Sequence, residues 1–208
     1  MTDFFFNSYK DASLIRVFLE LVVFLLGIWS VWLVKKVNIL AYPTGLIATV
    51  ITTYLLYEAG YLGDMMLNGY FSIMSIYGWY QWGRNKDKIT QNKQISRTNK
   101  TEKIIGILLF LLTIFVVFAV YKTFDYPIRP DNYVDMLSSG LFFTAMWYMA
   151  HKKIENWTLW IIGDIVVVPL YAYRGLGMLA LQYLIFTILA VWAYWTWRKT
   201  LNSNIQSL

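Results

Sequence analysis

The sequence predicts an all-α membrane protein with seven transmembrane helices in a parallel 3+1+3 repeat. Three observations predict it: the composition, a series of long apolar runs, and a weak likeness between the two ends of the chain. Of the 208 residues, 58% are hydrophobic, 19% aromatic and only 14% charged, and the mean hydropathy is +0.48. Ordinary soluble domains carry about 25% charged residues. The composition therefore indicates that lipid is the solvent.

Seven apolar runs have the length of about 17–25 residues that a helix needs to cross roughly 30 Å of hydrocarbon. Their hydrophobicity is continuous rather than alternating, which favours helices over a closed barrel. The predicted spans are Leu14–Val34, Ile39–Tyr57, Met65–Trp82, Ile104–Tyr121, Tyr133–Met149, Trp157–Tyr173 and Leu179–Trp197. With only 4 prolines and 12 glycines, residues 1–208 are expected to form one transmembrane domain.

Taken in order, several spans carry features beyond their length. The first is too long for the apolar region of a cleavable signal peptide and lacks a small-residue cleavage site, so we expect it to stay in the mature protein. It contains Arg16 and Glu20, which are spaced as a local ion pair. Asp135, near the start of the fifth span, is expected to cap its helix or to interact with the helix dipole.

The positive charges predict the orientation. In this topology 13 of the 18 Lys and Arg residues lie on one side of the membrane. By the positive-inside rule that side is the cytoplasm, so the N-terminus lies outside and the C-terminus inside. The basic stretch 84–103 is then interpreted as a cytoplasmic loop facing anionic lipid, and not as a nucleic-acid site.

A weak internal repeat predicts two halves. An offset of 118 residues aligns part of the first two spans with the fifth and sixth, and an offset of 115 aligns the ends of the third and seventh. The aligned pairs include Trp29 with Trp147, Asn38 with Asn156, Gly45 with Gly163, and Trp82 with Trp197. Residues 14–82 and 133–197 would be the two repeats, and 104–121 the linker helix. A displacement of four spans preserves direction, so the halves are parallel and a substrate would bind between them near the midplane.

Asp164 is the most distinctive candidate for the site. It lies seven residues beyond Trp157 in the sixth span, which places it about 10 Å into the helix. An ionised carboxylate at that depth is costly unless it faces protein, water or a cation. It is either a ligand for a substrate or ion, or a structural carboxylate that bonds to a neighbouring hydroxyl or amide.

Trp157 and Trp160 share a helix face with Asp164. The spacing i, i+3, i+7 places the three side chains within an arc of about 60°. Two indoles beside a carboxylate suit a flat organic cation, because the ring faces and the anion attract the same charge. The alternative is an aromatic belt, since all 10 tryptophans lie in the predicted cytoplasmic halves of their spans.

Two amides and two phenols are further candidates for the substrate site. Amide side chains within membrane spans are rarely exposed to lipid. Asn68 in the third span and Gln182 in the seventh are therefore expected to bond to a polar ligand or to one another. Tyr77 and Tyr183 are expected to line the same cavity. Hydrogen bonding between helices is the alternative role for the amides.

Nothing in the sequence favours an enzyme. There is no cysteine for a thiolate nucleophile or a Cys-ligated metal, and one histidine cannot form a multi-His centre. No Gly-rich phosphate loop is present. We therefore expect no catalytic residue, no metal and no cofactor.

The chain resembles the PnuC family of nicotinamide riboside carriers. The resemblance rests on residues 156–164, NWTLWIIGD, which fit the W-x-x-W-x-x-x-N/D signature of that family, and on residues 76–82, IYGWYQW. It covers about residues 14–198. It implies a SWEET-like fold, a homotrimer in the bacterial inner membrane, and uptake of nicotinamide riboside for NAD biosynthesis by facilitated diffusion with alternating access. By the same resemblance Trp157, Trp160 and Asp164 form the substrate motif, with Asn68 and Gln182 as polar partners.

Two alternatives remain open. Thiamine is also a flat cation, so the cargo is either nicotinamide riboside or another cationic vitamin. From a different class, the chain is a structural membrane protein without cargo, in which Asp164 and the amides join helices.

Overall fold

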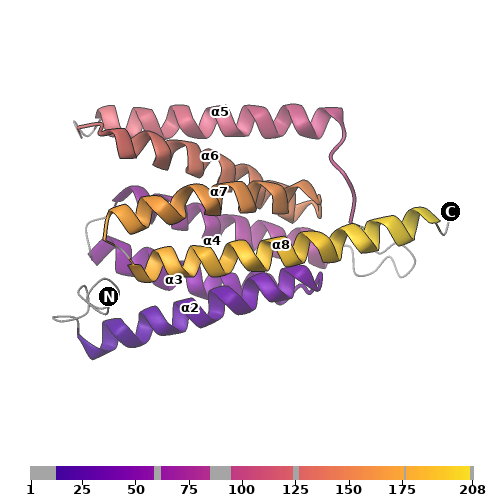
Figure 1. Cartoon of the computed structure of the whole chain (residues 1–208), viewed down its shortest axis with the longest axis horizontal. Helices are drawn as coiled ribbons and strands as arrows, with labels where there is room; N and C mark the ends of the chain where they lie inside the picture. The colour runs from indigo at the N-terminus through magenta and orange to yellow at the C-terminus, as the bar shows by residue number, and fades with distance from the viewer. Residues whose placement is uncertain (1–12, 59–61, 85–94, 124–126, 176, 207–208) are drawn as a thin grey trace.

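The computed structural model describes residues 13–58, 62–84, 95–123, 127–175 and 177–206 (Figure 1). Within them the chain forms seven α-helices, and the only extended pairing is an isolated bridge between Ser96 and Lys153. The predicted all-α class is confirmed. The helices are α2 (Leu14–Lys35), α3 (Ala41–Glu58), α4 (Leu62–Gly83), α5 (Lys100–Thr123), α6 (Pro130–Ala150), α7 (Glu155–Tyr173) and α8 (Gly177–Gln206).

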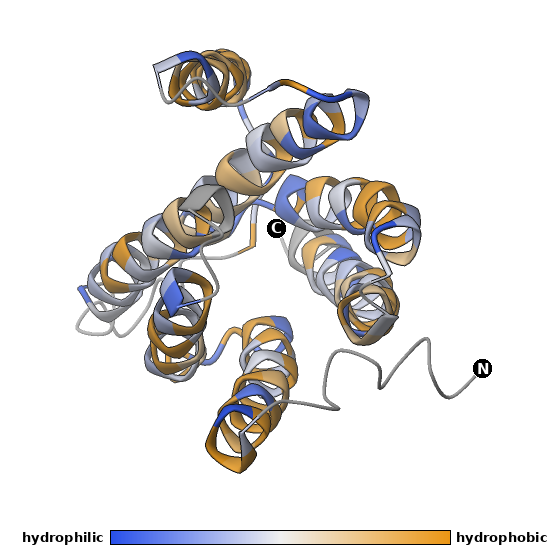
Figure 2. Cartoon of the chain, turned by 90° about the vertical axis from the view of Figure 1, so that its left-hand side faces the viewer, coloured by the Kyte–Doolittle hydropathy of each residue, from blue (hydrophilic) through white to orange (hydrophobic). Residues whose placement is uncertain are grey.

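Six of the helices form a closed ring. α3 packs between α2 and α4, and α7 packs between α6 and α8. Contacts of α4 with α6 and of α2 with α8 close the ring. α5 lies outside it against α6, at the top of Figures 1 and 2. This is the predicted 3+1+3 arrangement, with α5 as the linker between two three-helix repeats.

The two ends of the bundle differ in charge. One end carries Lys35, Arg84, Lys153 and Arg198, and we call it the basic end; it lies on the right of Figure 1. The opposite end carries Arg174, directly after α7, and we call it the Arg174 end. Figure 2 is seen from the Arg174 end.

The outward faces of the helices are apolar, as a lipid environment requires. On α5, Ile107, Leu108, Leu111 and Phe115 are each more than half exposed, and Figure 2 shows this helix as largely hydrophobic. By length and composition alone, α2, α5 and residues 177–203 of α8 can cross a membrane. The other helices carry more polar side chains; on α7, Asp164 is buried inside the ring.

Local sequence signals explain where the helices begin. The side chain of Ser13 accepts a hydrogen bond from the Arg16 backbone N–H at 3.3 Å and caps α2. Asn99 and Glu102 form a reciprocal capping box at the start of α5, with both hydrogen bonds at 2.8 Å. α5 therefore begins at Lys100, before the first apolar residue of the predicted span.

The buried side chains form two clusters. The larger, at the basic end, gathers residues from both repeats, including Val34, Tyr42, Trp82, Trp157 and Trp197. The smaller lies towards the Arg174 end and contains Phe142, Val167, Tyr171 and Ala180. The basic end is thus the more completely packed end of the ring.

The loops after α2 and α6 have the same conformation. Val37 and Lys152 are the described non-glycine residues with positive φ, and each has a φ of 54°. The Asn38 backbone N–H donates to the Leu33 carbonyl at 3.0 Å, and the Lys153 N–H donates to the Tyr148 carbonyl at 2.9 Å. Matching positions differ by 115 in number (152 less 37). The 118-residue offset predicted for the first two helices is therefore wrong by three residues in this loop.

Candidate substrate site

Three of the predicted site residues, Trp157, Trp160 and Asp164, lie on one face of α7, and this is the buried face of that helix. Trp157 is 1% exposed and Asp164 is 2% exposed, and Trp160 between them is half-buried. On the opposite face Ile162 and Ile165 are 45% and 56% exposed, as expected for contact with lipid. The spacing argument therefore placed these three side chains on the correct, inward side of the helix.

Asp164 is buried without a hydrogen-bond partner in the part of the chain that the structure describes. The equivalent position in the first repeat, 115 residues earlier, is Thr49, whose hydroxyl accepts a bond from Ser72 at 2.8 Å. The residue equivalent to Ser72 is Thr187. Both hydroxyls bond to the carbonyl four residues earlier, Ser72 to Asn68 at 3.0 Å and Thr187 to Tyr183 at 2.8 Å, but Thr187 makes no bond to Asp164 among the described residues. An unpaired carboxylate in a low-dielectric interior is costly. A positively charged ligand would satisfy it.

Trp160 belongs to an aromatic cluster contributed by several helices. It stacks on Phe142 of α6 with ring centroids 5.2 Å apart, and it contacts Phe71 of α4 at 5.9 Å. Tyr183 of α8 stacks on the same Phe142 at 6.1 Å. Tyr171 of α7 lies 5.2 Å from Tyr183. Rings from α4 and α6 therefore contact the Trp160 indole, and Tyr183 of α8 and Tyr171 of α7 extend the cluster beyond Phe142.

Trp157 lies in a different environment from Trp160. Its ring meets Trp197 of α8 edge to face, with centroids 5.4 Å apart and an interplanar angle of 87°. Its indole Nε1 is buried and has no hydrogen-bond partner among the described residues. The two indoles of the motif share a helix face but contact two separate groups of aromatic rings.

The predicted amides lie on different helices of the ring. Asn68 on α4 is half-buried, one turn from Phe71, and its carbonyl accepts a bond from the Ser72 hydroxyl at 3.0 Å. Gln182 is at the contact of α8 with α2, where a Cβ on Gly27 would lie 3.8 Å from its Nε2. At the offset of 115, Asn68 corresponds to Tyr183 rather than to Gln182.

Tyr77 and Tyr183 do not line one cavity. The Tyr77 hydroxyl lies 3.3 Å from His151 Nε2 at the basic end, and Tyr77 is 37% exposed. Tyr183 joins the cluster towards the Arg174 end. The expectation failed because the two tyrosines occupy different levels of equivalent helices: the counterpart of Tyr77 is Trp192.

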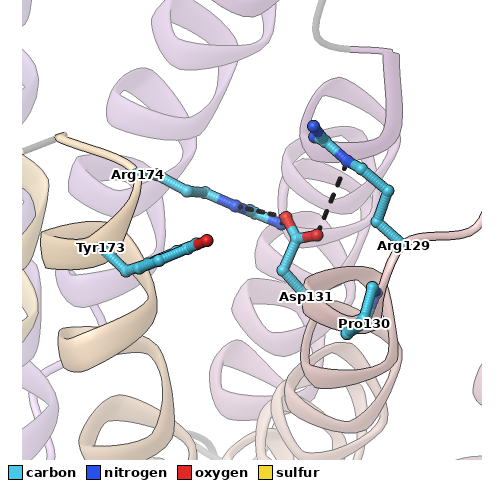
Figure 3. A pocket seen from close by; sticks show the side chains of 5 residues that line it. All are labelled: Arg129, Pro130, Asp131, Tyr173 and Arg174. Carbon is cyan, nitrogen blue, oxygen red and sulfur yellow. Dashed lines mark hydrogen bonds and ion pairs between the residues drawn. The ribbon is translucent and has the colours of Figure 1, made fainter.

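A charged cluster at the Arg174 end was missed by the sequence reasoning. The Arg174 guanidinium bonds to Asp131 and Asp135 together, with its Nη2 2.6 Å from an oxygen of each. Figure 3 shows the bond to Asp131. Arg129 lies 3.6 Å from Asp131 on the exposed side. A pocket of about 760 Å³ opens here. The four-residue spacing of the two aspartates was a signal for a shared cation, but nothing local indicates that the cation is Arg174.

The described residues contain no group of three or more His, Cys, Asp or Glu side chains that could hold a metal ion. The aromatic cluster and the Asp164 carboxylate together have the chemistry that suits an aromatic cation. They include no paired acid and base for a chemical reaction.

Comparison with known proteins identifies the family. The sequence profile described as nicotinamide mononucleotide transporter matches residues 17–199. The chain belongs to this family. Its members are membrane transporters and not enzymes, and the matched range contains the whole inward face of α7.

Individual relatives are distant. The nicotinamide riboside transporter PnuC of Escherichia coli is 24% identical over 199 residues, covering 83% of this chain and 82% of that protein. The riboflavin/roseoflavin transporter RibM of Streptomyces davaonensis is 25% identical over 128 residues, or 60% of this chain, and the match spans 58% of its length. A crystal structure of the vitamin B3 transporter PnuC covers 95% of this chain and 86% of that one, with a TM-score of 0.73 and 21% identity. That likeness supports the fold.

Proposed function

We propose that this protein carries nicotinamide riboside, or a closely related cationic vitamin, across the bacterial inner membrane. Transport is by facilitated diffusion with alternating access. The observation that carries the proposal is Asp164: a buried carboxylate without a partner among the described residues, one helical turn from the Trp160 indole, which contacts rings of α4 and α6. A flat pyridinium cation complements both the charge and the ring faces. The names of two relatives, a nicotinamide riboside and a riboflavin transporter, agree with a vitamin cargo.

The proposed site combines Trp157, Trp160 and Asp164 with Tyr183 and the amides Asn68 and Gln182. In this proposal Asp164 neutralises the cation, Trp160 stacks on the aromatic ring, and the amides bond to the polar part of the cargo. Tyr77 is not part of this proposed site, because it lies beside His151 at the basic end. Thiamine remains the alternative cargo, since it is also a flat cation.

The membrane arrangement is part of the same proposal. The N-terminus lies outside and the basic end faces the cytoplasm, as the distribution of 18 Lys and Arg residues predicts. We expect a homotrimer. α5 packs against α6 and exposes apolar side chains on its outer face, and these can contact either another subunit or lipid.

The test is calorimetric binding by the purified, detergent-solubilised protein, with nicotinamide riboside, thiamine and riboflavin titrated side by side. Asp164→Asn should weaken binding of the cationic cargo by about 10- to 100-fold, the value of a hydrogen-bonded charge. The matched control is Glu58→Gln, which changes an exposed carboxylate on α3 that bonds to Tyr54. It should leave affinity unchanged.

Each outcome has a separate meaning. Binding of nicotinamide riboside that is equally tight in Asp164→Asn would remove the carboxylate from the site but keep the cargo. Preference for thiamine or riboflavin would change the cargo. No binding of any of the three by a folded wild-type protein would contradict the transport proposal and favour a structural role.

A further inference from the structure

Two tryptophans join the repeats at the basic end. The Trp82 indole N–H on α4 donates to the carbonyl of Ala150 on α6 at 3.1 Å, and the Trp197 indole N–H on α8 donates to the carbonyl of Lys35 on α2 at 3.0 Å. The two tryptophans are 4% and 0% exposed. We call these the two indole–carbonyl bonds.

The two bonds are equivalent in the repeat. The donors 82 and 197 differ by 115, and so do the acceptors 35 and 150. Each indole also meets an aromatic ring of the middle helix of its own repeat edge to face: Tyr42 at 5.0 Å and 90°, and Trp157 at 5.4 Å and 87°. In each bond the donor and the acceptor lie in different repeats. The first repeat donates in one bond and the second repeat donates in the other.

Both acceptors are last residues of helices, Lys35 of α2 and Ala150 of α6. Such carbonyls have no partner within their own helix. A buried indole N–H also requires an acceptor. Separating the repeats at this end would leave all four groups unpaired until water reached them.

The positions of the bonds match the boundary between the repeats. The repeats meet where α4 contacts α6 and where α2 contacts α8, and each contact holds one indole–carbonyl bond. At the same end Tyr77 approaches His151, and the Lys35 ammonium lies 2.8 Å from the centroid of the Trp192 ring. A rigid-body opening of the basic end must break both bonds.

We propose that Trp82 and Trp197 are paired positioning residues that hold the basic end closed, and that they open together. This inference rests on the alternating access proposed above. Trp197 also contacts Trp157 of the substrate motif, so the closure at the basic end is in direct contact with one wall of the site. The protein described here is therefore closed at the basic end.

The experiment uses the absence of cysteine from the chain. Ala190→Cys introduces one thiol on α8 at a position that is 2% exposed in the core of the basic end. A membrane-impermeant maleimide is added without cargo to each side of oriented membrane vesicles. Asn202→Cys, on the exposed C-terminal part of α8, identifies the side that carries the basic end.

Trp82→Phe and Trp197→Phe, each made in the Ala190→Cys background, keep an aromatic ring but lose the N–H. The loss of one neutral hydrogen bond changes an equilibrium by about fivefold. Each substitution should therefore raise the rate at which the thiol is labelled from the basic side by about fivefold. The double variant should raise it by about 25-fold if the two effects add in free energy. Trp79→Phe and Trp195→Phe are the matched controls, because these tryptophans on the same two helices are 45% and 53% exposed. They should leave the rate unchanged.

Labelling that stays at the wild-type rate in both variants, or that rises equally in the controls, would overturn the inference. A second measurement needs no variant: the indole protons of Trp82 and Trp197 should exchange with deuterium at one common rate, slower than those of Trp79 and Trp195. Two different rates would show that the bonds do not open together. Because neither measurement uses cargo, failure of vitamin binding and failure of this inference remain distinguishable.

Discussion

At the scale of single residues, Gly163 determines where Trp160 lies. A Cβ at Gly163 would collide with the Phe142 ring, coming within 2.9 Å of its Cδ1 and 3.1 Å of its Cζ. Phe142 is 2% exposed and has little space to move. Since Phe142 is also the ring on which Trp160 stacks, the absence of a side chain at Gly163 allows the whole aromatic cluster to pack.

We expect Gly163→Ala to lower the free energy of unfolding by about 1–3 kcal/mol, the usual cost of overpacking a core. It should also weaken cargo binding, because a displaced Phe142 moves Trp160. Thermal unfolding in detergent and calorimetric affinity check the two effects.

Gly69→Ala is the matched control on α4, where a Cβ would meet no atom within 4 Å. Alanine is a better helix former than glycine by about 1 kcal/mol, so this variant should be equally or more stable and should bind normally. Similar losses in both variants would mean that the Phe142 contact is not the cause.

At the scale of helices, one cluster of charges holds α6 and α7 together at the Arg174 end. Arg174 follows the last residue of α7, and its guanidinium spans Asp131 and Asp135 in the first two turns of α6. The arginine side chain is only 20% exposed. Removing it would leave two carboxylates close together and partly shielded from water, which raises the energy of the folded state.

Arg174→Met should therefore lower the free energy of unfolding by about 2–3 kcal/mol, less than for a fully buried pair. Arg129→Met is the control: its pair with Asp131 is at 3.6 Å and the arginine side chain is 72% exposed, so its removal should cost less than about 1 kcal/mol. Thermal unfolding of both variants in the same detergent compares them. Equal stability of the two would contradict a role for the Arg174 cluster.

Helix existence could be predicted from the sequence, whereas some helix ends could not. Apolar runs report the part of a helix in contact with lipid, so each predicted span lies close to an observed helix. The seventh was predicted to end at Trp197, but α8 continues to Gln206 because Leu201 packs in the core of the basic end. α5 begins at the Asn99–Glu102 capping box, a short polar signal outside the apolar run.

At the scale of the whole molecule, the repeat could be recognised from the sequence but not aligned throughout. Apolar sequences match one another at several offsets, whereas the hydrogen bonds of the loops after α2 and α6 fix the offset at 115. That offset changes the interpretation of the site. It pairs Asp164 with Thr49 and Trp157 with Tyr42, so the charge and both indoles of the motif belong to one repeat only.

The same distinction explains how much of the site was predictable. Trp157, Trp160 and Asp164 share a face because helical periodicity is a local property of α7. Phe71 and Phe142 approach Trp160 from other helices, and no spacing along the chain reports such contacts. Tyr77 was misplaced for that reason: its neighbour His151 is 74 residues away.

The last prediction concerns the orientation of the molecule in its membrane. In the topology predicted from the sequence, 13 of the 18 Lys and Arg residues lie on one side of the membrane, the side of Lys35 and Arg198, and such residues are retained on the cytoplasmic side during insertion. In the cysteine-free chain, Ser13→Cys and Asn202→Cys place single thiols at exposed positions before α2 and near the end of α8. An impermeant maleimide should label Ser13→Cys in intact cells, and Asn202→Cys only after the cells are permeabilised. The opposite pattern would place the basic end outside, and the end held closed by Trp82 and Trp197 would then face the source of the vitamin instead of the cytoplasm.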